Sequence, residues 1–245
     1  MKIAVISGAS SGMGAEFARA LDSYGLDELW LIAKDDGLLE KIAPEFKTKV
    51  RLFPVDLTSS AFFDSLKAEY QASSVEIKYL VCSAGVGFNG DFENISERQI
   101  SLTVSLNCTA LSLLIKVSQP YFVEGTRVLN IASGSAFLPQ PSFAVYAASK
   151  AYVLSLSRAL GHELRKNKVY FTAVCPGPVD TGFFAGLENV KEYKKKYLIS
   201  PKTVAFGSLK ASKRKKKVYT PTFSMKMVHL ASKLLPTSLL LKFYK

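Results

Sequence analysis

The amino-acid sequence predicts an α/β fold, namely a doubly wound, mostly parallel, seven-stranded sheet with helices on both faces. Short apolar runs, typical of strands buried on both faces, alternate with longer segments whose apolar residues have helical spacing. Parallel strands joined by right-handed helical crossovers follow from that alternation. With 48% hydrophobic and 21% charged residues, the 245-residue chain can build a sizeable core.

The first half of the chain begins with the clearest strand and helix. Residues 3–7 are an apolar run that ends at Gly8. Residues 16–24 have helical spacing of their apolar side chains, and Gly25 is a suitable stop. The pattern then predicts, in order, a strand at 29–33, a helix at 38–46, a strand at 50–55, a helix at 62–70 and a strand at 77–82.

The second half continues the alternation as far as a Pro-Gly-Pro turn at 176–178. It predicts, in order, a helix at 97–119, a strand at 127–132, a helix at 142–167, a strand at 169–174, an irregular loop at about 179–200, a helix at 201–211 and a strand around 218–220. Pro236 interrupts any single helix in the last stretch, so we expect two short pieces there. The chain thus divides into one domain at 1–222 and an extension at 223–245.

The net charge of +12 is concentrated near the C-terminal end. Residues 187–245 hold 15 Lys and Arg against 2 Asp and Glu, whereas the first 186 residues hold 17 against 18. A nucleic-acid-binding domain needs a basic face, and the larger part of the chain has no basic excess. The run Lys213–Lys217 also lacks interleaved aromatic side chains on which bases could stack. We therefore expect no nucleic-acid partner.

Cysteine, histidine and targeting signals give a simple expectation about the compartment. The three cysteines and two histidines match no disulfide framework or metal-ligand spacing, so we expect no metal. No signal-peptide pattern follows Met1, and no uninterrupted run reaches the roughly 18 apolar residues of a spanning helix. These features favour a reduced, cytoplasmic location.

A glycine-rich turn stands between the first strand and the first helix, with the spacing Gly8-x3-Gly12-x-Gly14. Glycines permit a tight turn and a close approach of the backbone, and the helix N-terminus offers N–H groups to a pyrophosphate. A turn used only for packing is the alternative, but its place at the start of a strand–helix–strand unit favours a dinucleotide. The expected cofactor-binding residues of the turn are Gly8, Ser10, Ser11, Gly12, Met13 and Gly14.

The end of the second strand bears on the choice of cofactor. Lys34 follows this strand directly, and a basic residue there suits the 2′-phosphate of NADP rather than NAD. Asp35 and Asp36 come next and work against that preference. Asp56, followed by Leu57, ends the third strand, where it could meet the adenine amino group or cap the next helix. We expect NADP to be favoured over NAD.

A second motif combines a tyrosine, a lysine and a serine. Tyr146 and Lys150 are four residues apart on an expected helix and therefore lie on one face. A neighbouring cation lowers the pKa of a phenol from its usual value near 10, so Tyr146 could act as an acid or base. Ser133, just after the fifth strand, could hydrogen-bond a carbonyl oxygen. Each residue also has an ordinary structural explanation, as a core tyrosine or a turn serine.

Taken together, these residues resemble the short-chain dehydrogenase/reductase family in order and spacing over roughly residues 2–185. The resemblance implies a Rossmann-type fold and a nicotinamide-dependent reaction that interconverts a ketone and a secondary alcohol. It also implies a homodimer or homotetramer. The matching positions are the glycine turn, Asn107, Ser133, Tyr146-x3-Lys150 and Pro176-Gly177.

The resemblance implies a role for each matched residue. Tyr146 is the general acid/base, Lys150 lowers its pKa and binds the nicotinamide ribose, and Ser133 orients the carbonyl. Asn107 holds a water that links Lys150 to solvent. Further cofactor contacts are expected at Ala84, Gly85, Pro176, Gly177, Val179 and Thr181.

One position departs from the family pattern. Cys82-Ser83 precedes Ala84-Gly85 where the family usually has two asparagines, whose amides brace the sheet. This substitution concerns the rigidity of the loop more than the chemistry, since every proton-handling position is kept.

The expected substrate wall is apolar and rich in aromatic side chains, which favours a hydrophobic substrate such as a steroid, a bile acid, an acyl or a ring ketone. Several of the phenylalanines could instead close the core or a subunit interface. The expected substrate residues are Val86, Phe88, Ser135, Phe137, Phe143 and Phe183.

Two questions stay open at the level of the sequence. The basic and apolar residues of the C-terminal extension could form a solvated tail, pack across a subunit interface or lie on an anionic membrane surface. A non-catalytic redox sensor or scaffold that binds the cofactor is the alternative to an enzyme, although such a protein would be expected to lose Tyr146 or Lys150.

Overall fold

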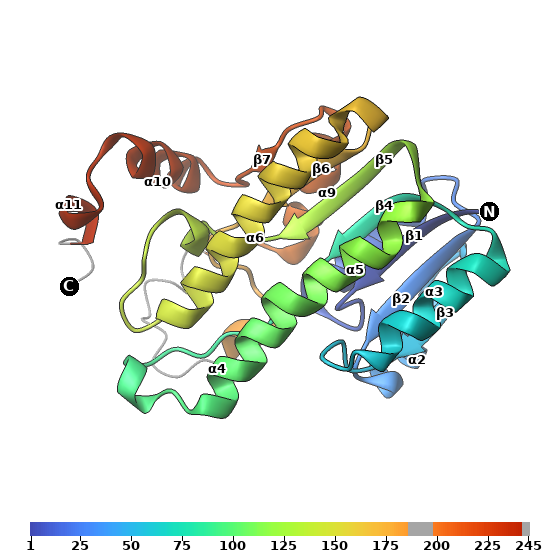
Figure 1. Ribbon diagram of the computed structural model, residues 1–245, viewed down its shortest axis with the longest axis horizontal. Coiled ribbons are helices and arrows are strands. Elements are labelled where there is room, and N and C mark those ends of the chain that lie inside the picture. Colours follow the sequence, from blue (N-terminus) through green and yellow to red (C-terminus); the bar gives the residue numbers. More distant parts are fainter. Residues whose placement is uncertain (186–197, 242–245) are drawn as a thin grey trace.

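The computed structural model describes residues 1–185 and 198–241 (Figure 1). Most of the irregular loop expected at about 179–200, namely residues 186–197, and the last four residues lie outside the described part of the chain.

The sheet has seven strands, all parallel, in the order β3-β2-β1-β4-β5-β6-β7. The predicted fold class is therefore confirmed. Its strands are β1 (Lys2–Ser7), β2 (Glu28–Ala33), β3 (Lys49–Pro54), β4 (Glu76–Cys82), β5 (Phe122–Ile131), β6 (Tyr170–Val174) and β7 (Val218–Tyr219). Successive strands run outward from β1 on one side and from β4 on the other, so the strand order reverses between these two. In open α/β sheets, ligands bind in the crevice at that reversal, beyond the carboxyl ends of the strands.

Helices cover both faces of the sheet (Figure 1). The α-helices are α1 (Gly12–Leu21), α2 (Asp36–Ile42), α3 (Ala61–Ser73), α4 (Glu97–Val104), α5 (Leu111–Ser118), α6 (Ala144–Glu163), α7 (Gly182–Ala185), α9 (Pro201–Lys213), α10 (Phe223–Leu234) and α11 (Thr237–Leu241). A π-helical turn, η3 (Ser105–Ala110), joins α4 to α5. Short 3₁₀ segments are η1 (Ala43–Glu45), η2 (Phe92–Asn94), η4 (Gln119–Tyr121), η5 (Gly134–Phe137) and η6 (Leu164–Asn167).

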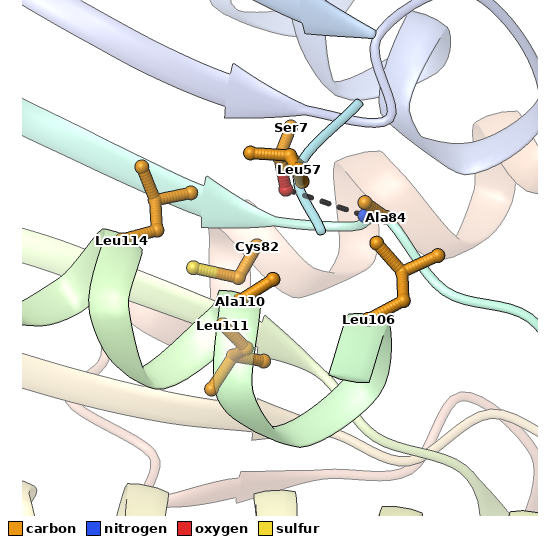
Figure 2. Close-up of a pocket in the computed structure, with 8 residues that line it drawn as sticks. All are labelled: Ser7, Leu57, Cys82, Ala84, Leu106, Ala110, Leu111 and Leu114. Carbon is orange, nitrogen blue, oxygen red and sulfur yellow. Dashed lines mark hydrogen bonds between the residues drawn. The ribbon is translucent and has the colours of Figure 1, made fainter. Parts of the chain in front are cut away.

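The carboxyl ends of β1 and β4 are tied together by a serine hydroxyl. The Oγ atom of Ser7 accepts hydrogen bonds from the backbone N–H groups of Ser83 (3.1 Å) and Ala84 (3.3 Å). A small cavity lies beside this bond, lined by Cys82 and by apolar side chains of the helix from η3 to α5 (Figure 2). Ser7 thus stabilises the loop that carries Cys82-Ser83 in place of the two asparagines usual at these positions.

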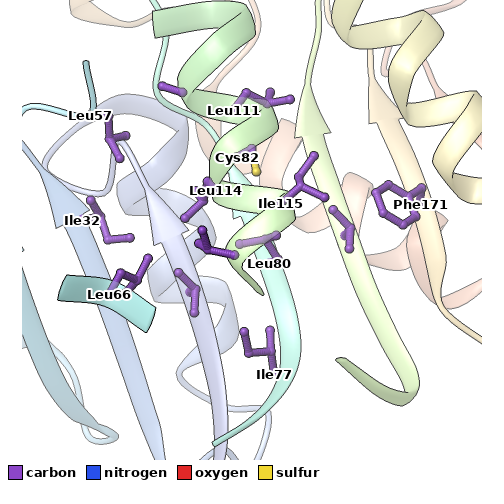
Figure 3. Packing of buried hydrophobic residues seen from close by; sticks show 14 of the residues in the cluster. Ile32, Leu57, Leu66, Ile77, Leu80, Cys82, Leu111, Leu114, Ile115 and Phe171 are labelled. Atoms are coloured by element: carbon purple, nitrogen blue, oxygen red, sulfur yellow. The ribbon is translucent and has the colours of Figure 1, made fainter. Parts of the chain in front are cut away.

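One hydrophobic cluster fills the space between the sheet and the helices α3, α5 and α6 (Figure 3). Leu66 of α3 and Leu114 of α5 are buried against the strand residues Ile77 and Leu80. A second cluster on the opposite face joins the sheet to α1, α2 and α9. The two faces are therefore both buried, as the continuous apolar runs of the strands require.

The long helix predicted at 97–119 is observed, interrupted by the π turn. Within the described residues, one helix (Glu97–Tyr121, 25 residues, with a mean hydropathy of 1.6 over an 18-residue window) is long and apolar enough by length and composition to cross a bilayer. Its α5 portion packs on β4 and α3, as a core helix does. We therefore interpret its apolar composition as serving the interior of the fold.

The C-terminal segment contains two helices on either side of Pro236, α10 and α11, as predicted. The run Lys213–Lys217, which starts at the last residue of α9 and ends just before β7, is exposed. The ammonium of Lys213 lies 4.0 Å from the ring centre of Tyr24, and that of Lys215 lies 4.7 Å from that of Tyr170. This basic run is a solvated loop that also rests on two aromatic rings.

Candidate active site and cofactor site

The glycine turn between β1 and α1 has the close backbone packing that its spacing predicts. Gly8 has a φ of +66°, in the left-handed region that favours glycine, and a Cβ there would lie 2.8 Å from the backbone nitrogen of Ala84. A Cβ on Gly14 would overlap the carbonyl oxygen of Gly8. Neither neighbour is a flexible side chain, so both positions require glycine. The turn therefore holds the chain close to the loop after β4.

The N-terminus of α1 is open to an anion. Ser11, the residue before the helix, makes no side-chain capping hydrogen bond, and it is exposed. Ser10, Gly12 and Met13 are half-buried around the same turn. A Cβ on Gly12 would lie 3.2 Å from the methyl carbon of Thr181, so these two expected cofactor residues lie side by side. The turn therefore fits a pyrophosphate group.

Asn107 lies in the π turn and connects three parts of the site. Its Oδ1 accepts a hydrogen bond from the N–H of Val86 (2.9 Å), and its Nδ2 donates to the carbonyl oxygen of Val86 (2.8 Å) and to the Oγ of Ser149 (2.9 Å). Ser149 lies on α6, between Tyr146 and Lys150, and donates to the carbonyl oxygen of Tyr146 (2.7 Å). Asn107 thus fixes the loop after β4 relative to α6. Its expected water-holding role stays a prediction.

Tyr146 is buried between aromatic rings at the start of α6. Its ring stacks on Phe143 (centroids 4.3 Å apart) and packs against Phe183 (5.4 Å). A Cβ on Gly87 would lie 2.5 Å from a ring carbon of Tyr146, so the loop after β4 also presses on this ring. Burial raises the pKa of Tyr146 to about 12, and a hydrogen bond with Ser133 acts in the opposite direction. The structure thus brings the expected serine and tyrosine into direct contact.

Lys150 lies one helical turn after Tyr146 and is also buried. Its ammonium donates to the carbonyl oxygen of Ile131 (2.9 Å) and lies 5.6 Å from the ring centre of Tyr146. Burial lowers the pKa of Lys150 to about 8. The net pKa of Tyr146 is thus raised, whereas the lowering effect expected of Lys150 stays a prediction. The loss of hydration of the phenolate outweighs the other effects, and the ammonium faces a backbone carbonyl.

The residues expected at the adenosine end form an ion pair. The Nζ of Lys34 lies 2.9 Å from the Oδ2 of Asp56. Lys34 and the hydroxyl and N–H of Thr58 together lower the pKa of Asp56 to about 2. Asp35 accepts a hydrogen bond from the N–H of Leu38 (2.9 Å) and so caps α2. Leu57, expected to contact the cofactor, is buried in the core beside Asp56.

The expected substrate residues divide into two groups. Phe143 and Phe183 lie on Tyr146, and Val86 is bonded through its backbone to Asn107. Phe137 instead stacks on His229 of α10 (4.3 Å, 14° between the rings) and lines an apolar groove of about 390 Å³ with Leu241. Phe88 is half-buried in the loop after β4, and Ser135 donates its backbone N–H to the Oγ of Ser133 (3.1 Å).

The structure adds one residue that the sequence analysis missed. Met225, on α10, contacts the loop after β6, where Pro176 and Gly177 are expected to pass beside the nicotinamide. A Cβ on Gly177 would lie 3.3 Å from the Cγ of Met225, and a Cβ on Gly134 would lie 2.5 Å from its sulfur. Val179 pairs with Ile199 and is buried. No local pattern marks Met225, because only the fold brings α10 to these glycines.

These residues fit a nicotinamide dinucleotide. The turn between β1 and α1 offers helix N–H groups to a pyrophosphate, and the backbone of Gly85 lies next to Lys150, since a Cβ there would be 3.1 Å from its Nζ. Ser133, Tyr146 and Lys150 stand together at the carboxyl end of the sheet, where such a ligand would present its reactive ring.

Comparisons with known proteins agree with this geometry. A family model described as short chain dehydrogenase matches residues 2–192. The chain is 28% identical over 189 residues to an uncharacterized oxidoreductase of Staphylococcus epidermidis, covering 76% of this chain and 82% of that protein. It is 30% identical over 185 residues to the 2,3-dihydro-2,3-dihydroxybenzoate dehydrogenase of Bacillus subtilis, covering 74% and 70%. It is 28% identical over 187 residues to the human very-long-chain 3-oxoacyl-CoA reductase, covering 71% and 58%.

Solved structures resemble almost the whole chain. A short-chain dehydrogenase from Sphingobium yanoikuyae in complex with NADPH has a TM-score of 0.83 at 27% identity, covering 96% of this chain and 94% of that one. A short-chain dehydrogenase/reductase from Burkholderia phymatum in complex with NAD gives 0.82 at 25%, covering 95% and 94%. The bulky-bulky ketone specific alcohol dehydrogenase from Comamonas testosteroni gives 0.77 at 26%, covering 96% and 92%.

Proposed function

Because the chain belongs to the short-chain dehydrogenase/reductase family, whose members are oxidoreductases acting on alcohol or ketone groups with a nicotinamide cofactor, we propose that it interconverts a hydrophobic ketone and a secondary alcohol with NADP. The observation that carries this proposal is the position of Tyr146, which contacts Ser133 and packs between Phe143 and Phe183. A proton donor is thus surrounded by apolar rings, next to a second hydroxyl.

Tyr146 transfers the proton in the proposed reaction. A phenol whose pKa is raised to about 12 is protonated at neutral pH, and it can give its proton to the more basic alkoxide oxygen that forms when a ketone is reduced. The hydroxyl of Ser133 holds that oxygen in place. Lys150, whose pKa of about 8 leaves it charged at pH 7, holds the nicotinamide ribose and favours the phenolate that remains. The nicotinamide, when bound, supplies or accepts the hydride.

The preference for NADP rests on the end of β2. Lys34 is the first residue after this strand, and 79% of its side chain is exposed, so its ammonium can reach a 2′-phosphate. The carboxylate of Asp35 already accepts the N–H of Leu38 as a helix cap, which reduces its competition for the ribose hydroxyls.

A substitution of Lys34 tests this preference. In Lys34→Ser we expect the KM for NADPH to rise about tenfold, with the KM for NADH unchanged, because one charge-assisted hydrogen bond is lost. Lys41→Ser, an exposed lysine on α2, serves as the control. Equal changes for both cofactors would contradict the assignment.

The hydrophobic substrate is proposed from the aromatic side chains around Tyr146. The test is the oxidation of NADPH, followed at 340 nm, against a panel of aliphatic, cyclic, aryl and steroid ketones matched with polar ketones. We expect turnover with members of the hydrophobic group. Turnover confined to polar ketones would overturn the substrate class, and no turnover with any ketone or with the corresponding alcohols would overturn the proposed reaction.

A homodimer or homotetramer is also proposed. Val104 of α4 and Tyr152 of α6 are large hydrophobic side chains more than 40% exposed, and both lie on helices of one face of the sheet. Light scattering coupled to size-exclusion chromatography should give two or four chain masses. A single chain mass at micromolar concentration would contradict this proposal.

A further inference from the structure

Helix α10 is apolar on two opposite sides. At about 100° per residue, Met225 and His229 lie on one side, where they contact Gly134, Gly177 and Phe137. The other side carries Phe223, Met227, Leu230 and Leu234, which fall within an arc of about 60° and which we call the outer stripe. The inner side makes the contacts of α10 with the loops after β5 and β6, whereas the outer stripe is largely exposed.

The outer stripe faces solvent along its whole length. Its side chains are 75%, 48%, 49% and 71% exposed in chain order, and Leu235 and Leu239, which follow it toward α11, are 43% and 42% exposed. Six of the eleven large hydrophobic side chains that are exposed in the described part of the chain thus lie between residues 223 and 239. Soluble proteins rarely expose so continuous an apolar patch without a partner.

The charges next to the outer stripe have one sign. Lys226 and Lys233 flank it on one side, and both are exposed. Neither takes part in an ion pair among residues 1–185 and 198–241. The sequence has no Asp or Glu after Glu192. Within the described part of the chain, the surface therefore combines an apolar ridge with lysines that no carboxylate pairs.

We infer that the outer stripe of α10 binds an anionic phospholipid surface. The apolar side chains would enter the boundary between head groups and acyl chains, while Lys226 and Lys233 contact the anionic head groups. A second copy of the chain fits this surface less well, because a two-fold contact would bring the lysines of both copies together without a carboxylate. The outer stripe and its two lysines thus fit a partner that has an apolar interior and a negatively charged surface.

The position of α10 gives such binding a consequence. The helix lies at the carboxyl-end edge of the sheet, where its inner side contacts the loops after β5 and β6 (Figure 1). Binding through the outer stripe therefore places the edge of the sheet that carries Tyr146 close to the bilayer. A hydrophobic ketone dissolved in the membrane would then be near the site. The lipid binding itself does not depend on the proposed reaction.

Vesicle flotation with the full chain tests the inference. Vesicles of phosphatidylcholine alone are compared with vesicles containing 30% phosphatidylserine. We expect the wild-type chain to float with the anionic vesicles. Met227→Ser/Leu230→Ser should weaken binding roughly tenfold or more through lost apolar burial. Lys226→Gln/Lys233→Gln should weaken it about 25-fold, since each lysine near an anionic surface contributes roughly fivefold.

Two control variants change the same side-chain types elsewhere. Lys216→Gln/Lys217→Gln removes two exposed lysines of the loop before β7, and Phe206→Ser removes a half-exposed aromatic ring of α9. Both should float as the wild type does. Circular dichroism melting curves of all variants should agree within a few degrees, which shows that loss of flotation is not loss of folding.

Three results would overturn the inference. The first is a wild-type chain that floats with neither kind of vesicle. The second is a loop variant, Lys216→Gln/Lys217→Gln, that loses as much binding as Lys226→Gln/Lys233→Gln. The third is a Met227→Ser/Leu230→Ser variant that floats like the wild type but dissociates into single chains by light scattering, which would assign the stripe to a protein interface.

Discussion

Replacing Lys150 by methionine should stabilise the cofactor-free protein while it removes activity. The ammonium of Lys150 is buried, and its pKa falls from 10.5 to about 8. At about 1.36 kcal/mol per pH unit, keeping this group charged at pH 7 costs the folded state about 3 kcal/mol. Methionine has a similar length and no charge. It loses one hydrogen bond to the carbonyl oxygen of Ile131, worth about 1 kcal/mol, so the net gain is about 2 kcal/mol.

The pH dependence identifies the cause. Because the folded-state pKa of Lys150 lies below its unfolded value, the unfolded chain binds more protons between about pH 8 and pH 10.5, and the stability of the wild type rises across that window. The variant has no such rise. We expect its advantage in the free energy of unfolding to shrink by about 2 kcal/mol between pH 7 and pH 9.5.

Urea unfolding of the cofactor-free proteins, followed by circular dichroism at both pH values, measures this effect. Lys116→Met, an exposed lysine on α5, is the control and should change stability by less than about 0.5 kcal/mol. A Lys150→Met variant less stable than the wild type at pH 7, or an advantage that stays the same at pH 9.5, would show that the buried charge does not destabilise the fold.

Two further substitutions probe the cofactor turn and its brace. Ser7→Ala removes the acceptor for the N–H groups of Ser83 and Ala84. It should lower the free energy of unfolding by about 1–2 kcal/mol, measured in a urea titration. Unchanged stability would show that these two hydrogen bonds do not stabilise the loop. Gly14→Ala places a Cβ against the carbonyl oxygen of Gly8, and should weaken cofactor binding at least tenfold in a fluorescence titration. The control Gly182→Ala, whose Cβ would meet nothing within 4 Å, should bind the cofactor with unchanged affinity. Unchanged affinity in Gly14→Ala would show that the turn is less tightly packed than the structure indicates.

The sequence predicts the sheet well because each strand carries its own signal. The apolar run at 3–7 and the glycines after it place β1 and the cofactor turn without reference to the rest of the chain. The end of β5 also lies close to the predicted one, but the strand starts at Phe122 and not at residue 127. Its first residues are partly polar and include a glycine, so the sequence does not indicate that this part pairs with β4. Strand ends that depend on pairing with a neighbouring strand are thus harder to predict from the sequence than buried apolar strands.

The site depends on contacts that no local pattern encodes. The π turn around Asn107 accompanies hydrogen bonds to Val86 and Ser149, which are 21 and 42 positions away in the chain. The burial of Tyr146, which reverses the expected direction of its pKa, comes from Phe143, Phe183 and the loop after β4. The spacing of the motif predicts which residues meet, whereas their solvation follows from the whole fold.

The C-terminal extension shows a similar limit. Its mixed apolar and basic composition is compatible with a tail, an interface or a membrane contact. The structure distinguishes the two sides of α10, because Gly134 and Gly177 leave room for Met225 on one side only. That packing turns Phe223 and Leu230 to solvent. Which side of an apolar helix becomes the buried one depends on small residues far away in the sequence.

Turnover of Tyr146→Phe, measured beside Tyr152→Phe, shows whether Tyr146 is the proton donor. Both tyrosines lie on α6, but the hydroxyl of Tyr152 is hydrogen-bonded to Ser112 on α5 (2.8 Å). We expect Tyr146→Phe to lower kcat at least about 100-fold, with cofactor affinity unchanged, and Tyr152→Phe to retain kcat within about twofold. Turnover of Tyr146→Phe within about tenfold of the wild type would show that Tyr146 is not the proton donor.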